Sequence, residues 1–229
     1  MKSVHQLGPL TLTLCGADRP SSVCCFLLPA AVPENFAEIG ENQDAAFLFL
    51  TGMDWNHDLS PWPAEGLFPG QSFAGKGQDF LRRLRKEIFP YAEDHLQVRD
   101  PVRFLGGVSM GGLFSLWAAA EGFPADGIAS LSGSLWFDRF LPYLEERPMP
   151  PRLKRVYLSL GNKEKRTRNR RLAAVEACTE ETAELLRSQH IETIFQKNRG
   201  NHFDFPEERL EEAVRYLLTG KVWKGPHSL

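Results

Sequence analysis

The sequence contains little cysteine, no marked excess of charge and no long apolar run, and each absence excludes a class of protein. Cysteine occurs only 4 times in 229 residues and never in C-x-x-C spacing, which argues against a disulfide framework or a cysteine metal site. The net charge of −2 provides no overall attraction to nucleic acid or to an anionic membrane. No segment reaches the roughly 18 apolar residues of a membrane span, and residues 1–8 lack the apolar core of a signal peptide.

These absences predict a cytoplasmic protein whose partners are small molecules. Cys15, Cys24 and Cys25 fall in strand-like runs, and together with Cys178 they are interpreted as buried thiols. The chain is 42% apolar, enough for a sizeable core in one α/β domain over residues 1–229. The sequence leaves the oligomeric state open.

Short apolar runs alternate with segments of helical periodicity along most of the chain. Strands are predicted at residues 11–14, 23–28, 45–50, 102–106, 127–132, 155–160 and 191–196, the first as an edge strand. Helices are predicted at residues 77–91, ending near Pro90, and at 113–120, 169–188 and 207–218. The alternation predicts an α/β fold, a mainly parallel sheet with helices on both faces and ligands beyond the carboxyl ends of the strands.

Residues 107–111 read Gly-Val-Ser-Met-Gly and lie between a strand-like run and a helical run rich in alanine and leucine. A strand that reverses sharply into a helix needs glycine on both sides of the apex, because a Cβ there would collide with its neighbours. Ser109 would stand at this apex, beside a helix N-terminus that favours developing negative charge. The pattern predicts a nucleophilic serine for acyl transfer. The alternative is that Ser109 only caps the helix.

A serine nucleophile needs a base, and the base needs a group that orients it. His202 is the best placed histidine, since it follows a strand-like run and precedes the last predicted helix, in the chain order serine, acid, histidine. Glu164 is the one carboxylate in the loop after strand 155–160 and is the first candidate for the acid. Asp204 is the competing acid, and a Ser-His dyad oriented by a backbone carbonyl is the third option. His57 is a candidate for a substrate contact.

The oxyanion of a tetrahedral intermediate needs two backbone donors. We expect one to be the N–H of Met110, directly after the nucleophile, and the other to come from the loop after the third predicted strand. Met53 is the first choice in that loop and Asp54 the next. The same loop carries Trp55 and Trp62, which would either wall a substrate pocket or pack the loop onto the body of the protein.

Several segments together resemble the esterase D-like branch of the α/β-hydrolases, which includes the enterobactin-type siderophore esterases. They are residues 48–52, 73–81, 106–113, 131–138 and 200–202. The resemblance implies an α/β-hydrolase fold and metal-independent hydrolysis of carboxylic esters without a cofactor, with Ser109 and His202 in the catalytic positions. Trp136, in the segment Ser-Gly-Ser-Leu-Trp, would lie at the pocket rim or cap the sheet.

The predicted function is hydrolysis of a small-molecule ester through a Ser-His-acid triad and an acyl-enzyme. The same groups would serve a thioesterase or an acyltransferase, and a catalytically idle hydrolase fold acting as a binding module is the alternative from another class. A basic run begins on the loop of Glu164. Its members are Lys163, Lys165, Arg166, Arg168, Arg170 and Arg171. This run is either a positive rim that attracts anionic esters or an ordinary solvated helix start.

Overall fold

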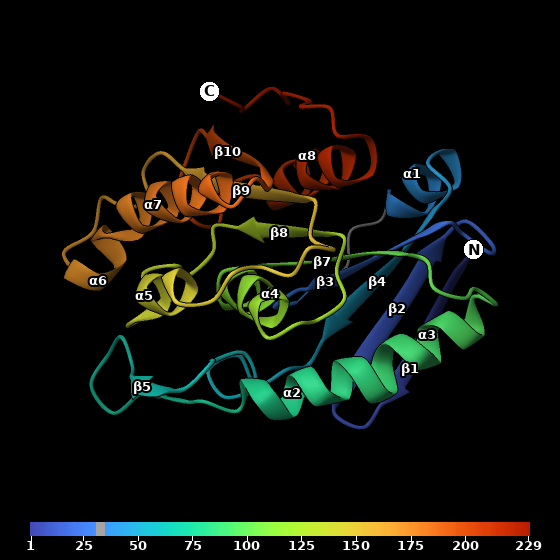
Figure 1. Cartoon of the computed structure of the whole chain (residues 1–229), viewed down its shortest axis with the longest axis horizontal. Helices are drawn as coiled ribbons and strands as arrows, with labels where there is room; N and C mark the ends of the chain where they lie inside the picture. The colour runs from blue at the N-terminus through green and yellow to red at the C-terminus, as the bar shows by residue number, and fades with distance from the viewer. Residues whose placement is uncertain (31–34) are drawn as a thin grey trace.

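An eight-stranded sheet forms the centre of the computed structural model, which describes residues 1–30 and 35–229 (Figure 1). The strands follow the order β1-β2-β4-β3-β7-β8-β9-β10. Their bounds are β1 Lys2–Leu7, β2 Leu10–Gly16, β3 Ser22–Leu27, β4 Ala45–Thr51, β7 Val102–Val108, β8 Gly127–Leu131, β9 Arg155–Gly161 and β10 Glu192–Asn198. Strand β2 is antiparallel to β1 and β4, and all pairs from β4 to β10 are parallel. The predicted mainly parallel α/β sheet is confirmed.

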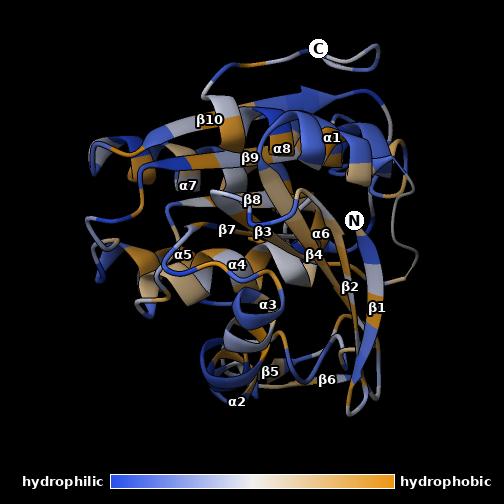
Figure 2. Cartoon of the chain, turned by 90° about the vertical axis from the view of Figure 1, so that its right-hand side faces the viewer, coloured by the Kyte–Doolittle hydropathy of each residue, from blue (hydrophilic) through white to orange (hydrophobic). Residues whose placement is uncertain are grey.

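Helices cover both faces of this sheet (Figures 1 and 2). Their bounds are α1 Phe36–Asn42, α2 Gly77–Arg83, the π-helical turn η1 Leu84–Ile88, α3 Phe89–His95, α4 Met110–Ala120, α5 Phe140–Glu145, α6 Arg170–Ala173, α7 Val175–Ser188 and α8 Pro206–Thr219. Helices α1 and α8 contribute to the hydrophobic core on one face, and α2 to α5 and α7 contribute to the core on the other. Because both faces are covered, the inner strands bury side chains on both sides and their sequences are continuous apolar runs.

One edge of the sheet is β1, a strand that the sequence pattern did not predict. Its residues alternate between half-buried and exposed, and it is mostly hydrophilic in Figure 2, so it lacks the apolar run by which the other strands are identified. The predicted edge position of residues 11–14 is wrong, because they form the centre of β2, which pairs with both β1 and β4. The strand at Ala45–Thr51 is therefore the fourth along the chain and not the third.

The helix that was predicted to end near Pro90 continues to His95. The π-helical turn η1 precedes α3, and Pro90 lies in the first turn of α3. Proline is tolerated in the first turn of a helix, where its missing N–H costs little. The preceding π turn also changes the backbone hydrogen bonds, so that the proline ring does not clash with the carbonyl one α-helical turn before it. The helix predicted at residues 169–188 is divided into α6 and α7 at Ala174.

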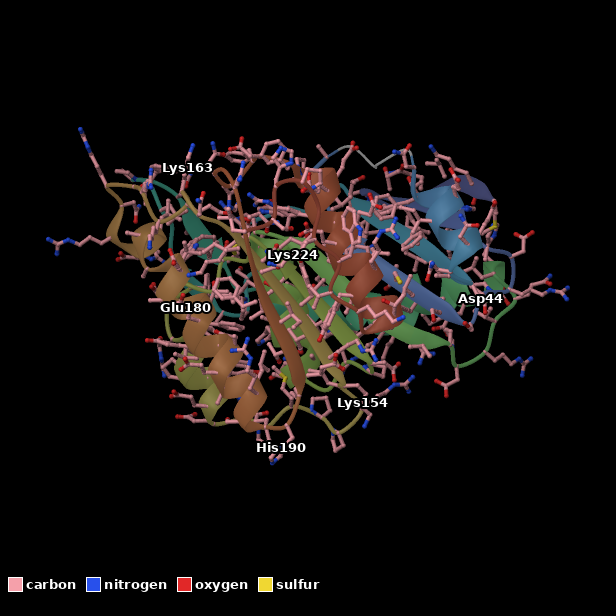
Figure 3. All side chains as sticks on the ribbon, turned by 90° about the horizontal axis from the view of Figure 1, so that it is seen from above. Asp44, Lys154, Lys163, Glu180, His190 and Lys224 are labelled. Carbon is pink, nitrogen blue, oxygen red and sulfur yellow. The ribbon has the colours of Figure 1, made fainter. Side chains whose placement is uncertain are left out.

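The carboxyl ends of the parallel strands lie at one edge of the sheet. In Figure 3, Lys163, just beyond the end of β9, lies at the opposite end of the molecule from Lys154 and His190, which precede β9 and β10. The loop after β4 extends from this edge and contains a small hairpin, β5 (Pro63–Glu65) and β6 (Ser72–Ala74). The candidate site is assembled from the loops at this edge.

Candidate active site

Ser109 occupies the apex of a tight turn between β7 and α4. Its backbone angles are φ 53° and ψ −119°, a region that costs a non-glycine residue on the order of 1–3 kcal/mol. The Ser109 N–H donates to the Leu131 carbonyl at 2.9 Å, which anchors the turn to β8. A Cβ at Gly107 would lie 2.7 Å from the backbone carbon of Gly111, so this turn requires glycine there. The local geometry is the strand, turn and helix that the sequence predicts.

The Ser109 side chain faces a cavity at the carboxyl edge of the sheet. Its Oγ lies 3.2 Å from the Oγ of Ser134, in the loop after β8. Met110 is the first residue of α4, so its N–H has no carbonyl partner within the helix. This N–H is therefore available to a negatively charged oxygen bound beside Ser109.

His202 and Glu164 form a hydrogen-bonded pair at the same edge. His202 Nδ1 lies 2.8 Å from Glu164 Oε2, and the Glu164 side chain is only 4% exposed. Burial by itself raises the pKa of Glu164, but hydrogen bonds from His202, Ser132 and the Gly161 N–H outweigh it and hold the pKa below its ordinary value. Glu164 is therefore ionised at neutral pH and accepts a hydrogen bond from a protonated Nδ1.

The two other polar side chains that the sequence offered to this site lie elsewhere. Asp204 Oδ2 accepts a hydrogen bond from the Asn201 N–H at 2.8 Å. This carboxylate therefore stabilises the turn of its own loop and is not the partner of His202 Nδ1. His57 Nδ1 lies 3.0 Å from Asp54 Oδ2 on the surface, and the cavity residues that the structure describes do not include His57. The structure therefore brings Glu164, rather than Asp204, to His202.

Ser109, Glu164 and His202 line one cavity of about 590 Å³. Most of its wall is apolar or aromatic. This part consists of Trp55, Leu67, Phe68, Phe73, Met110, Trp136, Leu172, Val175 and Phe203. Phe68 and Phe203 are strongly exposed at the rim. A second cavity, of about 620 Å³, lies between α1, α8 and the C-terminal segment and contains none of the three polar residues. The first cavity can hold a small organic molecule against the serine.

The three tryptophans proposed for substrate binding have different positions. Trp55 and Trp136 line the cavity, and Trp136 also packs under the guanidinium of Arg171. Trp62 lies outside it, because its indole N–H donates to the Asp138 carbonyl at 3.1 Å and its ring packs on Tyr143. Trp62 therefore packs the loop onto α5 and does not line the cavity, contrary to the predicted role in substrate binding.

Met53 was predicted as an oxyanion donor because it follows the third predicted strand. Strand β3, and not β4, lies beside β7, where Leu27 pairs with Gly107. The loop beside the Ser109 turn is therefore the one after β3, while Met53 follows β4 and packs against the hydrophobic core. Because β1 precedes the predicted strands, Ala45–Thr51 is the fourth strand along the chain, and Met53 does not follow the third.

The basic run contributes fewer charges to the cavity than its sequence suggests. Only Lys163 and Arg166 of the run line it. Lys165 is paired with Glu176 at 2.7 Å, and Arg171 donates to Asp138 and to the Glu65 carbonyl. A positive rim would therefore consist of Lys163 and Arg166.

Ser132 and Arg209 also belong to the site, and the sequence argument did not single them out. Both contact Glu164. Arg209 had a sequence signal, because it lies beside Leu210 on the buried face of an amphipathic helix, where a charged side chain is rare unless it is paired. Ser132 is the first residue of the segment Ser-Gly-Ser-Leu-Trp that carries the family resemblance, but nothing in that segment indicated a contact with Glu164.

Within residues 1–30 and 35–229, no group of three or more His, Cys, Asp and Glu side chains is arranged to hold a metal ion. Over the same residues, none of the helices is both long and apolar enough to cross a membrane.

The chain is similar to known proteins in sequence and in fold. It matches the family model Esterase, described as "Putative esterase", over residues 50–205. It is 29% identical to "Uncharacterized protein YbbA" of Bacillus subtilis (strain 168) over 157 residues, which are 60% of this chain and 62% of that relative, less than two thirds of its length. Two solved structures are similar over nearly their whole lengths. Siderophore hydrolase EstA from Aspergillus nidulans is 19% identical with a TM-score of 0.67, covering 97% of this chain and 94% of EstA. The BES protein from Bacillus cereus is 15% identical with a TM-score of 0.72, covering 94% of each chain.

These structural matches have low identity and therefore bear on the fold, which is that of the α/β-hydrolases. The family model bears on the sequence itself. It spans more than half of the chain, including Ser109, Glu164 and His202. The chain therefore belongs to the family described as "Putative esterase".

Proposed function

We propose that this chain hydrolyses small-molecule carboxylic esters through Ser109, His202 and Glu164, with an acyl-enzyme intermediate. The observation that carries the proposal is the Glu164–His202 pair, 2.8 Å apart and lining the same cavity as the strained Ser109. A nucleophile, a base and a group that orients the base are the parts that this chemistry needs. Membership of the esterase family supports the same reaction.

In the proposed reaction, Ser109 Oγ attacks the ester carbonyl carbon while His202 Nε2 takes the hydroxyl proton. Glu164 keeps Nδ1 protonated and stabilises the imidazolium that forms. The imidazolium then protonates the leaving alcohol, and the acyl group remains on Oγ. A water molecule, deprotonated by the same imidazole, attacks the acyl carbon and releases the acid and free Ser109.

Two backbone N–H groups stabilise the oxyanion in this proposal. One is that of Met110, and the other comes from the loop after β3. In that loop the Leu28 N–H already donates to the Leu50 carbonyl, and Pro29 has no N–H. Ala30 is therefore the first residue of the loop whose N–H can serve, and it replaces Met53 as our candidate.

The cavity supports an ester with an apolar or aromatic part. Its wall is largely apolar, while Lys163 and Arg166 add positive charge. The similar structure EstA is described as a siderophore hydrolase, so catecholate trilactones belong in a substrate screen beside simple esters. Thioesters belong there as well, because the same serine and histidine would serve a thioesterase or an acyltransferase.

We also propose a cytoplasmic location and one domain over residues 1–229. The four cysteines are free thiols, and Cys15, Cys24 and Cys25 are buried. Burial raises the pKa of Cys15 to about 11 and that of Cys25 to about 12, so these thiols are unreactive at neutral pH. This supports Ser109, and not a cysteine, as the nucleophile.

The test combines covalent labelling with a substrate screen. A fluorophosphonate should label the wild-type protein rapidly at Ser109 and should not label Ser109→Ala. The screen compares p-nitrophenyl acyl esters, thioesters and catecholate trilactones, with Ser109→Ala as the blank. Absence of both labelling and turnover in folded wild-type protein would favour a binding module. The strained Ser109 backbone argues against that outcome, since an idle site has no need of the strain.

A further inference from the structure

Arg209 is a buried cation at a position that is unfavourable for positive charge. It lies in the first turn of α8, which begins at Pro206, and the dipole of a helix disfavours a cation at its N-terminus. Its side chain is 3% exposed. Its Nε is buried without a hydrogen-bond partner among the residues that the structure describes. Such a side chain is destabilising unless its remaining contacts compensate.

Those contacts all belong to the candidate active site. Nη1 donates to Ser132 Oγ at 2.7 Å and to Glu164 Oε1 at 3.3 Å, and Nη2 donates to the Asn201 carbonyl at 2.9 Å. Ser132 Oγ in turn donates to Glu164 Oε1 at 2.6 Å. One guanidinium therefore meets the loops after β8, β9 and β10, and it reaches both Glu164 and the residue before His202.

The backbone around the guanidinium makes room for it. A Cβ on Gly161, at the end of β9, would lie 2.7 Å from Arg209 Nη2. Ser132 has φ 46°, a left-handed conformation that is costly for serine. Ser132 Oγ accepts the shortest hydrogen bond that the Arg209 side chain donates, and it donates its own hydrogen bond to Glu164 Oε1. The three loops are thus shaped around the guanidinium.

We propose that Arg209 is a positioning residue of the active site, which holds Glu164 ionised and directed at His202 Nδ1 and fixes the His202 loop through Asn201. This inference rests on the proposed function. Arg209 does not itself touch the substrate or the reacting atoms. Its planar fork suits the role, because one guanidinium can donate to several acceptors at fixed angles.

Other charged groups near the pair differ from Arg209 in exposure or direction. Lys163 and Arg166 reach the cavity from the loop after β9, but they are exposed, so water and salt screen them. Asp204 accepts a hydrogen bond from the Asn201 N–H within the loop of His202, so its carboxylate is occupied within that loop. On α8 itself, two acids are engaged elsewhere: Glu208 with His227 and Glu212 with Tyr157. The turn after β7 places the neutral Ser109 in the same cavity.

The first test is the pH dependence of Arg209→Met. We expect kcat to fall about tenfold or more, with little change in KM, and the acid limb of kcat/KM to move upward by about one pH unit. Removing a nearby cation favours the protonated form of the Glu164–His202 pair as a whole. The matched control is Arg215→Met on the same helix, where Arg215 pairs with Glu211. It should leave both kcat and the acid limb unchanged.

A second measurement needs no ester and separates this inference from the proposed function. In the Ser109→Ala background, ¹³C NMR follows the titration of the Glu164 carboxyl, assigned by its loss in Glu164→Gln. Adding Arg209→Met should raise the midpoint, and adding Arg215→Met should not. If wild-type protein neither hydrolyses esters nor reacts with a fluorophosphonate, the proposed function fails, and this titration still tests Arg209.

Arg209→Lys covers the case in which Arg209→Met does not fold. Lysine keeps the charge but cannot donate to both Glu164 and Asn201 in the same geometry, so kcat should fall severalfold while the acid limb stays in place. Wild-type kcat in Arg209→Lys would overturn the inference. So would a folded Arg209→Met variant in which neither the acid limb nor the Glu164 midpoint moves.

Discussion

Replacing Glu164 with glutamine tests the proposed triad through a hydrogen-bonding pattern that the structure makes unambiguous. Glu164 Oε1 accepts from Ser132 Oγ, the Gly161 N–H and Arg209 Nη1, whereas Oε2 faces His202 Nδ1. A glutamine has one carbonyl oxygen and one NH₂ group. The oxygen should take the place of Oε1, where donors converge, and the NH₂ group should therefore face His202.

This arrangement puts the imidazole in the wrong tautomer. An NH₂ group at His202 Nδ1 needs an acceptor there, so the ring proton moves to Nε2, the atom that must take the proton of Ser109. The corresponding aspartate-to-asparagine change in a serine protease lowers kcat by about 10⁴. We expect a loss of about 10³ to 10⁴ in kcat with little change in KM, because the contacts to bound substrate are not altered. The variant should also be less stable, by about 3–5 kcal/mol, since the buried Arg209 loses its counterion.

The assay is steady-state hydrolysis of a p-nitrophenyl ester by wild-type protein, Glu164→Gln and Asp204→Asn, with urea unfolding of each variant. Asp204→Asn is the matched control, because the Asp204 carboxylate accepts its hydrogen bond from Asn201 in the same loop, and it should lower kcat much less. More than about a tenth of wild-type kcat in Glu164→Gln would refute the argument. The reverse ranking of the two variants would assign the acid to Asp204, and near-neutral effects of both would indicate a Ser-His dyad.

Ser109→Ala should lower kcat by several orders of magnitude, up to about 10⁶, without unfolding the protein. Adding His202→Ala should lower kcat little further, because the two residues act as a unit. Retention of a few per cent of activity in purified Ser109→Ala would exclude Ser109 as the nucleophile. Because the pKa of Glu164 is lowered in the folded protein, its ionised form stabilises the fold above the unfolded pKa of about 4.3, and this stability is lost as pH falls through the lower, folded pKa. The difference in unfolding free energy between wild-type protein and Glu164→Gln, from urea titrations, should therefore shrink on acidification, and a difference that stays constant down to about pH 3 would contradict the shift. If Lys163 and Arg166 attract substrate, kcat/KM should fall for an anionic ester, and not for a neutral ester of similar size, as salt rises from roughly 20 mM to 500 mM. The double variant Lys163→Glu, Arg166→Glu should weaken that salt dependence, whereas equal responses to both esters would make the two residues ordinary solvated surface.

Features that depend on a few neighbouring residues could be predicted from the sequence. The inner parallel strands are mostly apolar because both faces of the sheet are covered, and the predicted α/β fold is confirmed. The turn at Ser109 was identifiable because backbone sterics demand glycine at Gly107, where a Cβ has no room. The same local reasoning failed at β1, since a half-exposed edge strand needs no apolar run, and at Pro90, where a π turn accommodates the proline.

Only the tertiary structure decided which side chains share the site. The sequence offered Glu164 first and Asp204 second as the partner of His202. Contacts between residues far apart in the chain distinguished them, since Glu164 lies 38 positions from His202 and 45 from Arg209. Trp62 does not line the pocket, because its ring packs against Tyr143 of α5. Such pairings depend on strand order and on the angles at which loops leave the sheet. These are properties of the packed chain as a whole, and no short segment encodes them.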